Sequence, residues 1–375
     1  MSILSKLQES MKSLEQETQH AGYWYSIQES LIILLCGLLC RQETISEIHE
    51  WAESAPTQLF LAEEFGITRI PCRAQFYNIL GCINAEKFNY YFTKWVQNLL
   101  PNNLSGKTVA IDGKTICSTD KLTNDGSVLH IASAIVSEYG LVIGSQECGT
   151  KTGEITAFRE LIKMLEIQGA IVVADALHCN QKSAEAVIDA GADYLFVIKD
   201  NVPKIKADIE LYIQEETVGT FTTVEKNGGR IEKRTAYATC DIAWLDGREH
   251  YKNLSCIGAI HRQFEKAGQT SSEWHYYISS KTLTPEELLI HARLEWGVEA
   301  MHWLLDVHFS EDKTRVWNMN LQKNLNIMRK TVLNLAKVFK AHNCHKSSLI
   351  GVLRRNLFDP KVFSDFLGFF RKDAN

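Results

Sequence analysis

The chain has 375 residues, of which 45% are hydrophobic and 23% are charged, and only six are prolines. A chain of this length can bury a large core, and this composition argues against extensive disorder. The most apolar run, "LIILLCGLLC" (31–40), is half the length of a membrane-spanning helix, which takes about 20 residues. Since no signal-peptide pattern is evident either, we expect a globular cytoplasmic protein with no membrane association.

The ten cysteines are scattered singly and include no CxxC pair. Without an export signal, we expect them to be reduced thiols. The neighbours His178/Cys179 and Cys344/His345 lack a second half at the usual zinc spacing, so a zinc site is not expected.

The formal net charge of −5 does not indicate a nucleic-acid-binding protein, but the charge is unevenly placed. Residues 313–375 carry thirteen Lys/Arg and three Asp, a local charge of +10 that leaves −15 for the rest of the chain. Such asymmetry suggests a polyanionic partner for the C-terminal part. A solvated helical surface explains it equally well.

The first 100 residues are predicted to be helical. Residues 25–40, 44–55 and 85–100 carry apolar side chains at helical spacing, and Thr44 with Glu47 forms a possible capping box. From residue 107 the pattern changes to strands, first at 107–117 and then in a predicted hairpin of 129–138 and 141–150.

The next segments alternate between helix and strand. We expect helices at about 154–168, 181–190 (ending at Gly191) and 203–216, with strands at 170–175 and 194–199. This order, β-β-β-α-β-α-β-α, predicts a mixed sheet with helices packed on it. Residues 219–280 then predict hairpins, the first with an Asn-Gly-Gly turn at 227–229, and residues 284–343 return to helix.

Three carboxylates stand out by their surroundings. Asp112 lies inside an apolar strand and Asp175 ends another, while Glu299 lies in an amphipathic helix. Apolar residues of that helix are expected to pack in the core: Trp296, Val298, Trp303, Leu304 and Val307.

Each carboxylate also has an ordinary structural explanation. An aspartate at a strand end is most often a turn or cap residue, and a helical glutamate is usually solvated. Carboxylates that meet at strand ends would instead suit Mg²⁺, which prefers hard oxygen ligands. In a ribonuclease H-like sheet the first and fourth strands are neighbours, so Asp112 and Asp175 could converge.

Six segments stand in a distinctive order: "AIDGKTI" (110–116), "HIASAI" (130–135), 151–181, "GADYLFVIKDN" (191–201), 296–315 and 324–337. Together they resemble an insertion-sequence DDE transposase of the H-repeat-associated (ISAs) type. The resemblance covers nearly the whole chain, and the order and spacing of the segments are more specific than any one of them.

The resemblance implies a mixed α/β fold with a ribonuclease H-like catalytic core. It places the catalytic and metal-binding triad on Asp112, Asp175 and Glu299, with Mg²⁺, or Mn²⁺ in its place, as cofactor. It also implies a helical N-terminal associated domain, here 1–103, and a catalytic domain at 104–343. A β-rich insertion lies at about 219–280 within that domain, and residues 344–375 form a helical tail.

Some positions depart from the family pattern. The glutamate is usually followed by asparagine, and here Ala300 follows it; "KGNQ" is replaced by "KDNV", which introduces Asp200 and Val202. An arginine often precedes the glutamate by four residues, and a lysine often follows it by seven. Glu295 and Asp306 occupy those places.

The implied function is cleavage of insertion-sequence ends and their joining to target DNA. The implied partners are double-stranded DNA, at element ends and target, and further copies of the chain in a homodimer or larger assembly. Localisation would be a prokaryotic cytoplasm, with nucleoid association on DNA. Candidate contacts to DNA phosphates are Lys114, Lys199, Arg293, Lys313 and Arg315. The alternatives are a catalytically impaired, DNA-binding remnant and a nuclease of the same fold that does not transpose.

Overall fold

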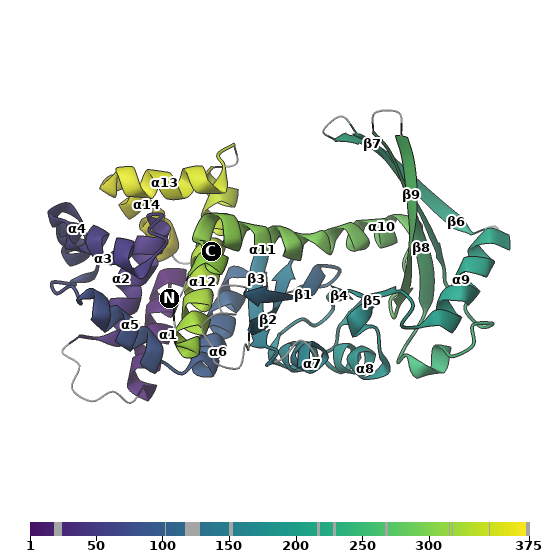
Figure 1. The fold of residues 1–375 in the computed structure, drawn as a ribbon, viewed down its shortest axis with the longest axis horizontal. Helices are drawn as coiled ribbons and strands as arrows, with labels where there is room; N and C mark the ends of the chain where they lie inside the picture. Colours follow the sequence, from purple (N-terminus) through teal and green to yellow (C-terminus); the bar gives the residue numbers. More distant parts are fainter. Residues whose placement is uncertain are drawn as a thin grey trace.

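The computed structural model describes residues 1–18, 25–101, 103–116, 128–149, 153–215, 218–227, 230–266, 269–314, 316, 318–344 and 346–372. Helices gather at one end of the molecule and four long strands stand at the other (Figure 1). Two successive helices run along the top of the sheet and connect these ends.

The N-terminal part is helical, as predicted. Its helices are α1 (Ile3–Glu17), α2 (Ile27–Leu39), α3 (Ile45–Glu53), α4 (Ala55–Phe65), α5 (Arg73–Cys82) and α6 (Ala85–Val96), followed by the 3-10 turn η1 (Gln97–Leu99). Most of α2 is buried, so the apolar run is a core helix. The capping box of Thr44 and Glu47 is confirmed at the start of α3.

The sheet begins with three antiparallel strands and continues with two parallel ones. These are β1 (Thr108–Ile116), β2 (Leu129–Val136), β3 (Leu141–Glu147), β4 (Ile171–Ala174) and β5 (Asp193–Ile198). Their order in the sheet is β3-β2-β1-β4-β5, with β1 parallel to β4. The connecting elements are α7 (Glu154–Met164), η4 (Ala176–His178), α8 (Gln181–Asp189) and α9 (Pro203–Glu215). The predicted helix at 154–168 therefore ends four residues early.

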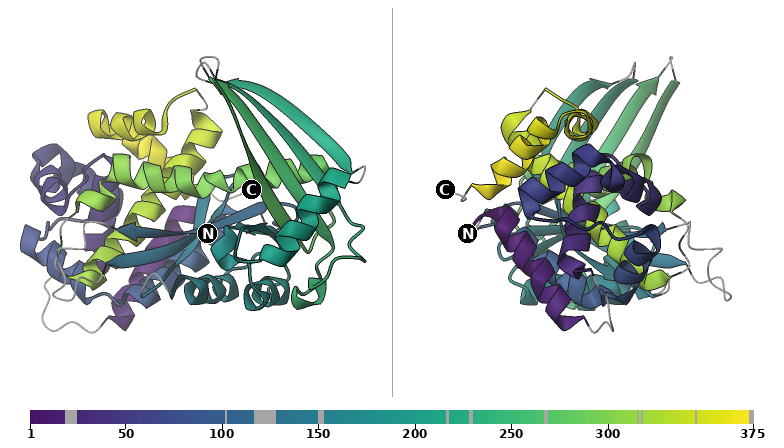
Figure 2. Two further views of the ribbon diagram at one scale, coloured as in Figure 1. Left: turned by 45° about the vertical axis from the view of Figure 1, so that its right-hand side comes forward. Right: turned by 90° about the vertical axis from the view of Figure 1, so that its left-hand side faces the viewer.

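Residues 219–280 form two hairpins that extend the same sheet. Their strands are β6 (Gly219–Asn227), β7 (Arg230–Thr239), β8 (Cys256–Lys266) and β9 (Gln269–Ser279), with the 3-10 turn η5 (Arg248–His250) between β7 and β8. The last strand, β9, pairs antiparallel with β5, which gives one nine-stranded sheet. The four strands project well beyond the rest of the sheet (Figure 2). The predicted Gly-Gly turn at 228–229 lies outside the described residues.

The C-terminal helices cover the sheet and return to the N-terminal helices. They are α10 (Pro285–Leu294), α11 (Trp296–Phe309), the 3-10 turn η6 (Glu311–Lys313), α12 (Met319–Asn343), α13 (Leu349–Phe358) and α14 (Pro360–Arg371). Helix α12 packs against α5, α6 and β3. The Asn334 side chain accepts a hydrogen bond from the Val142 N–H at 2.9 Å and donates one to the Val142 carbonyl at 2.8 Å. These two bonds provide partners for backbone groups of the edge strand β3.

This architecture confirms the predicted mixed α/β, ribonuclease H-like fold class. The division into domains near residues 103 and 343 stays a proposal. In the described part of the chain, no helix combines the length and apolar character needed to cross a membrane.

Candidate active site

The parallel pairing of β1 and β4 brings the two aspartates together. Ile111 lies opposite Ala174, so Asp112 and Asp175 each follow a paired residue on neighbouring strands. Helix α11 packs across β1 and carries Glu299 in its first turn. All three carboxylates line one pocket, with a volume of about 290 Å³.

Asp175 has a structural role that does not exclude a catalytic one. Its Oδ1 accepts a hydrogen bond from the Leu177 backbone N–H at 2.9 Å and so caps the short turn η4. The side chain is nevertheless 50% exposed and lines the pocket. The cap therefore fixes the carboxylate at the strand end while leaving it accessible.

Asp112 lies in surroundings that disfavour its negative charge. Burial raises the pKa of Asp112 to about 6, and repulsion from Glu154, Asp175 and Glu299 adds to the shift. His302 Nδ1 lies 3.6 Å from Asp112 Oδ2, but burial lowers the pKa of His302 to about 3. Its imidazole is therefore neutral at pH 7 and provides no counter-charge.

Glu295 is a fourth carboxylate in the same pocket. Burial raises its pKa to about 7, helped by repulsion from Asp175, Asp112 and Glu299 and opposed by Lys199. The sequence marked Glu295 only as a departure from a family arginine. Sequence reasoning missed its membership of the site, although Glu295 has helical backbone angles and stands four residues before Glu299, a spacing that places both on one face.

Only some of the residues predicted to contact DNA phosphates line the pocket. Lys199 and Arg293 line the pocket. Lys114 instead forms buried ion pairs with Asp306 and, at 2.6 Å, with Glu311, because the strand turns its side chain beneath α11. Lys114 therefore does not line the pocket.

Two other predicted contacts are not brought to the pocket. Lys313 is exposed on η6 and is not among the residues that line it. Arg315 lies outside the described residues.

The expected core packing of the tryptophans of α11 is wrong. Trp296 is 47% exposed and Trp303 is 56% exposed. The predicted packing of Val298 is confirmed and Leu304 is partly buried, but Val307 is 46% exposed; the buried face consists of Val298, Met301, Leu305 and Phe309. These follow one another at three- and four-residue steps, so the tryptophans fall off the buried face. Trp296 lines the pocket, with the Arg262 guanidinium 5.1 Å from its ring centroid.

A buried His–Glu–His cluster lies close behind the aspartates. Glu154 contacts His130 Nε2 at 2.8 Å and His178 Nε2 at 3.3 Å, and His178 Nε2 lies 4.0 Å from Asp175 Oδ1. A Cβ added at Gly113 would meet the Glu154 carboxylate at 2.5 Å. Sequence reasoning missed this cluster because its members lie in three separate segments and are individually unremarkable.

The pocket has the donor chemistry for a divalent cation, although its ligands are not assembled. Among the described residues, no group of three His, Cys, Asp or Glu side chains is placed to hold a metal ion. The pocket donors are carboxylate oxygens, the ligands that Mg²⁺ prefers. The raised pKa values of Asp112 and Glu295 reflect burial first and repulsion between the carboxylates second, and a bound cation would offset both.

Comparison with known proteins agrees with this fold. Residues 105–335 match the family described as "Transposase DDE domain", and residues 8–96 match the "DDE_Tnp_1-associated" family. The chain is 30% identical to "H repeat-associated putative transposase YhhI" of Escherichia coli K12, over 90% of this chain and 93% of that protein. It is 28% identical to "Putative transposase YncI" of E. coli O157:H7, over 84% of this chain and 82% of that protein.

The fold and the pocket define a ribonuclease H-like protein with an acidic site at the ends of its central strands. The family match spans more than half of the chain, and the chain belongs to the DDE transposase family. Among solved structures, a piggyBac transposase synaptic complex with hairpin DNA aligns over all of this chain and 80% of its own, at 12% identity. Its TM-score of 0.43 is too low to support an argument.

Proposed function

We propose that the protein is a metal-dependent DNA transposase that cleaves insertion-sequence ends and joins them to target DNA. The observation that carries the proposal is the shared pocket of Asp112, Asp175 and Glu299, which the chain order and the strand pairing bring together. The partner is double-stranded DNA. A homodimer or larger assembly would hold the two ends of the element.

The three carboxylates would hold the divalent cation, Mg²⁺ or Mn²⁺. When bound, it would supply Lewis-acid activation and charge neutralisation for an in-line phosphodiester displacement. The chain itself contributes positioning and electrostatics. Lys199 and Arg293 border the pocket and would orient the phosphate, while the pKa of Glu295, raised to about 7 chiefly by burial, favours its protonated form and limits the negative charge.

Mg²⁺-dependent cleavage of a plasmid that carries the gene with its flanking DNA tests the proposal. Wild-type protein should release DNA ends and join them to a second plasmid. Asp175→Asn should fold normally and lose cleavage, because an amide is a poor replacement for a carboxylate ligand. Asp200→Asn is the matched control, since its side chain is 93% exposed and does not line the pocket.

The same assay separates the alternatives. Cleavage without joining would indicate a nuclease that does not transpose. Binding without cleavage would indicate an impaired remnant, a possibility raised by Ala300 beside Glu299. Equal cleavage by wild type and Asp175→Asn would refute the assignment of the site.

A further inference from the structure

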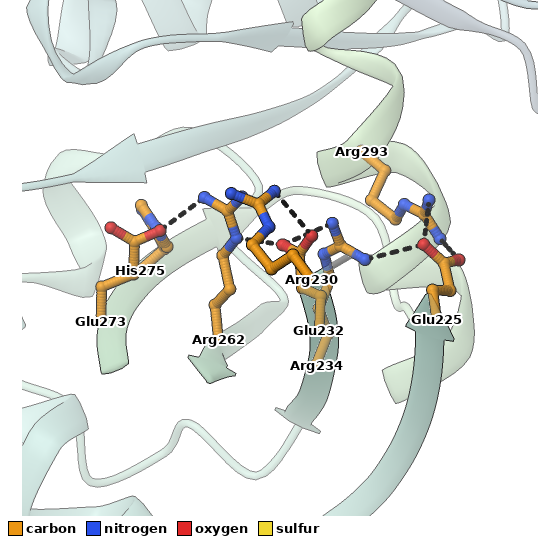
Figure 3. Close-up of polar contacts among 8 residues, drawn as sticks. All are labelled: Glu225, Arg230, Glu232, Arg234, Arg262, Glu273, His275 and Arg293. Carbon is orange, nitrogen blue, oxygen red and sulfur yellow. Dashed lines mark hydrogen bonds and ion pairs between the residues drawn. The ribbon is translucent and has the colours of Figure 1, made fainter. Parts of the chain in front are cut away.

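One face of the insertion strands carries a continuous network of charged side chains. The strand register places Arg234 opposite Arg262, and Arg262 opposite Glu273. Two residues further along, Glu225 faces Glu232 across β6 and β7. Because side chains alternate between the faces of a strand, these residues share one face. Figure 3 shows that side chains of this face point toward one another and toward Arg293 of α10.

Buried Glu232 is the centre of the network. It pairs with Arg234 at 2.6 Å and Arg230 at 3.1 Å, and also with Arg262 Nε. At its two ends, Glu273 accepts from Arg262 Nη1 at 2.7 Å, and Glu225 accepts from Arg293 Nη1 at 2.5 Å. Hydrogen bonds from these arginines keep the pKa of Glu225 low, so it stays ionised.

The same arginines form one wall of the acidic pocket. Arg234, Arg262 and Arg293 line it together with Lys199 and His275, while Asp112, Asp175, Glu295 and Glu299 line it as well. A guanidinium carries five N–H donors, so the two contacts that Arg262 makes with glutamates leave three. We call Arg234, Arg262 and Arg293 the arginine wall.

We propose that the arginine wall binds the phosphate backbone of a DNA strand lying along the carboxylates, and that Glu225 and Glu273 are exchangeable counter-ions of the free protein. This inference rests on the proposed function and names the insertion as part of the DNA-binding surface. Arg–phosphate pairs resemble Arg–carboxylate pairs in geometry and charge, so a phosphate can take over the donors that a rim glutamate occupies.

If the glutamates are counter-ions, replacing an arginine and replacing a glutamate should change the affinity for DNA in opposite directions. The ion pairs of the network join Arg230, Arg234, Arg262, Arg293 and His275 to Glu225, Glu232 and Glu273, so its charges largely offset one another in the free protein. Removing an arginine removes a phosphate contact. Removing the charge of Glu273, which is partly exposed at the rim, frees Arg262 for phosphate. A network with a purely structural role would be weakened by both changes.

Fluorescence anisotropy with a labelled duplex oligonucleotide tests this without catalysis, in EDTA and over salt concentrations from about 50 to 200 mM. The variants are Arg262→Gln and Glu273→Gln. Lys233→Gln is the control, because Lys233 is an exposed cation on β7 that points to the opposite face from Arg234. Circular dichroism establishes that each variant is folded, and Arg293→Gln replaces Arg262→Gln if that variant unfolds.

We expect Arg262→Gln to lower the slope of log K against log salt by about 0.9. Lys233→Gln should leave the slope unchanged, and Glu273→Gln should tighten binding by about threefold at the lower salt concentration, on the order of one phosphate contact. Equal slopes for Arg262→Gln and wild type, or weaker binding by Glu273→Gln, would overturn the inference.

The two proposals fail differently. Wild-type protein that binds no duplex overturns both. Wild-type protein that binds and cleaves DNA, while Arg262→Gln binds with an unchanged slope, overturns only the arginine wall.

Discussion

Replacing Asp112 by asparagine should stabilise the metal-free protein at pH 8. The pKa of Asp112 is raised from 3.8 to about 6, chiefly by burial and further by the surrounding carboxylates. The folded state therefore holds this proton more tightly than the unfolded chain does. As pH rises from about 4 to 6 the unfolded chain releases this proton while the folded protein still holds it, so stability falls over this range and stays lowered at higher pH. Asparagine carries no charge and escapes this loss.

The shift of about two pKa units sets an upper limit of about 3 kcal/mol, at about 1.4 kcal/mol per unit. Because the side chain is 37% exposed, solvent screens the repulsion, and we expect about 1 kcal/mol. The gain should shrink to about half at pH 5, where the folded wild type has regained most of its proton.

Urea denaturation in EDTA at pH 8 and pH 5 measures both quantities. Asp200→Asn is the control, because its exposed carboxylate lies outside the pocket and should give no pH-dependent difference. A variant less stable than wild type at pH 8, or a gain that is the same at both pH values, would refute the reasoning.

Two further predictions concern the cluster behind the aspartates. Burial raises the pKa of Glu154, but hydrogen bonds from His130 and His178 outweigh it and lower the value to about 2. This ionised group stabilises the fold by up to about 3 kcal/mol above pH 4.5, and the contribution is lost as pH falls toward 2. In urea denaturation at pH 7, Glu154→Gln should therefore have a lower free energy of unfolding than wild type. The difference in free energy between the two proteins should be smaller at pH 3. A difference that is the same at both pH values would exclude the charge effect. Gly113→Ala should lower the free energy of unfolding by about 1–3 kcal/mol, because the added Cβ displaces the Glu154 side chain. Gly368→Ala is the control, because its Cβ meets open space on a helix and should not destabilise the protein. Equal urea midpoints for the two variants would contradict the packing argument.

Local patterns were enough to predict the strands that carry the aspartates. The apolar runs before Asp112 and Asp175 reflect strands buried on both faces, which is typical of the centre of a mixed sheet. Their pairing followed from the β-β-β-α-β order together with the family resemblance. The capping of η4 by Asp175 was also within reach of the sequence, because a cap depends only on neighbouring residues.

The other residues of the pocket are brought there by pairing between strands far apart in the sequence, which no local sequence pattern predicts. Antiparallel pairing of β9 with β5 decides which face of the hairpins meets the carboxylates. Before that face is known, Arg234 and Arg262 are indistinguishable from solvated strand residues. Lys114 shows the converse: it shares the face of β1 with Asp112, yet it stands two residues further along the strand, where its side chain is held by Asp306 and Glu311.

The junction between α10 and α11 links the insertion to the carboxylates. Arg293 ends one helix and is tied to Glu225 of β6, while Glu299 begins the next, with Glu295 at the break between them. Helix α10 also packs against β6 and β7, so the insertion strands contact the helix that precedes Glu299. In the part of the chain that is described, the carboxylates are not yet grouped to hold a metal ion. We therefore expect phosphate bound at the arginine wall to remove the tie between Glu225 and Arg293, at the end of the helix that precedes Glu299.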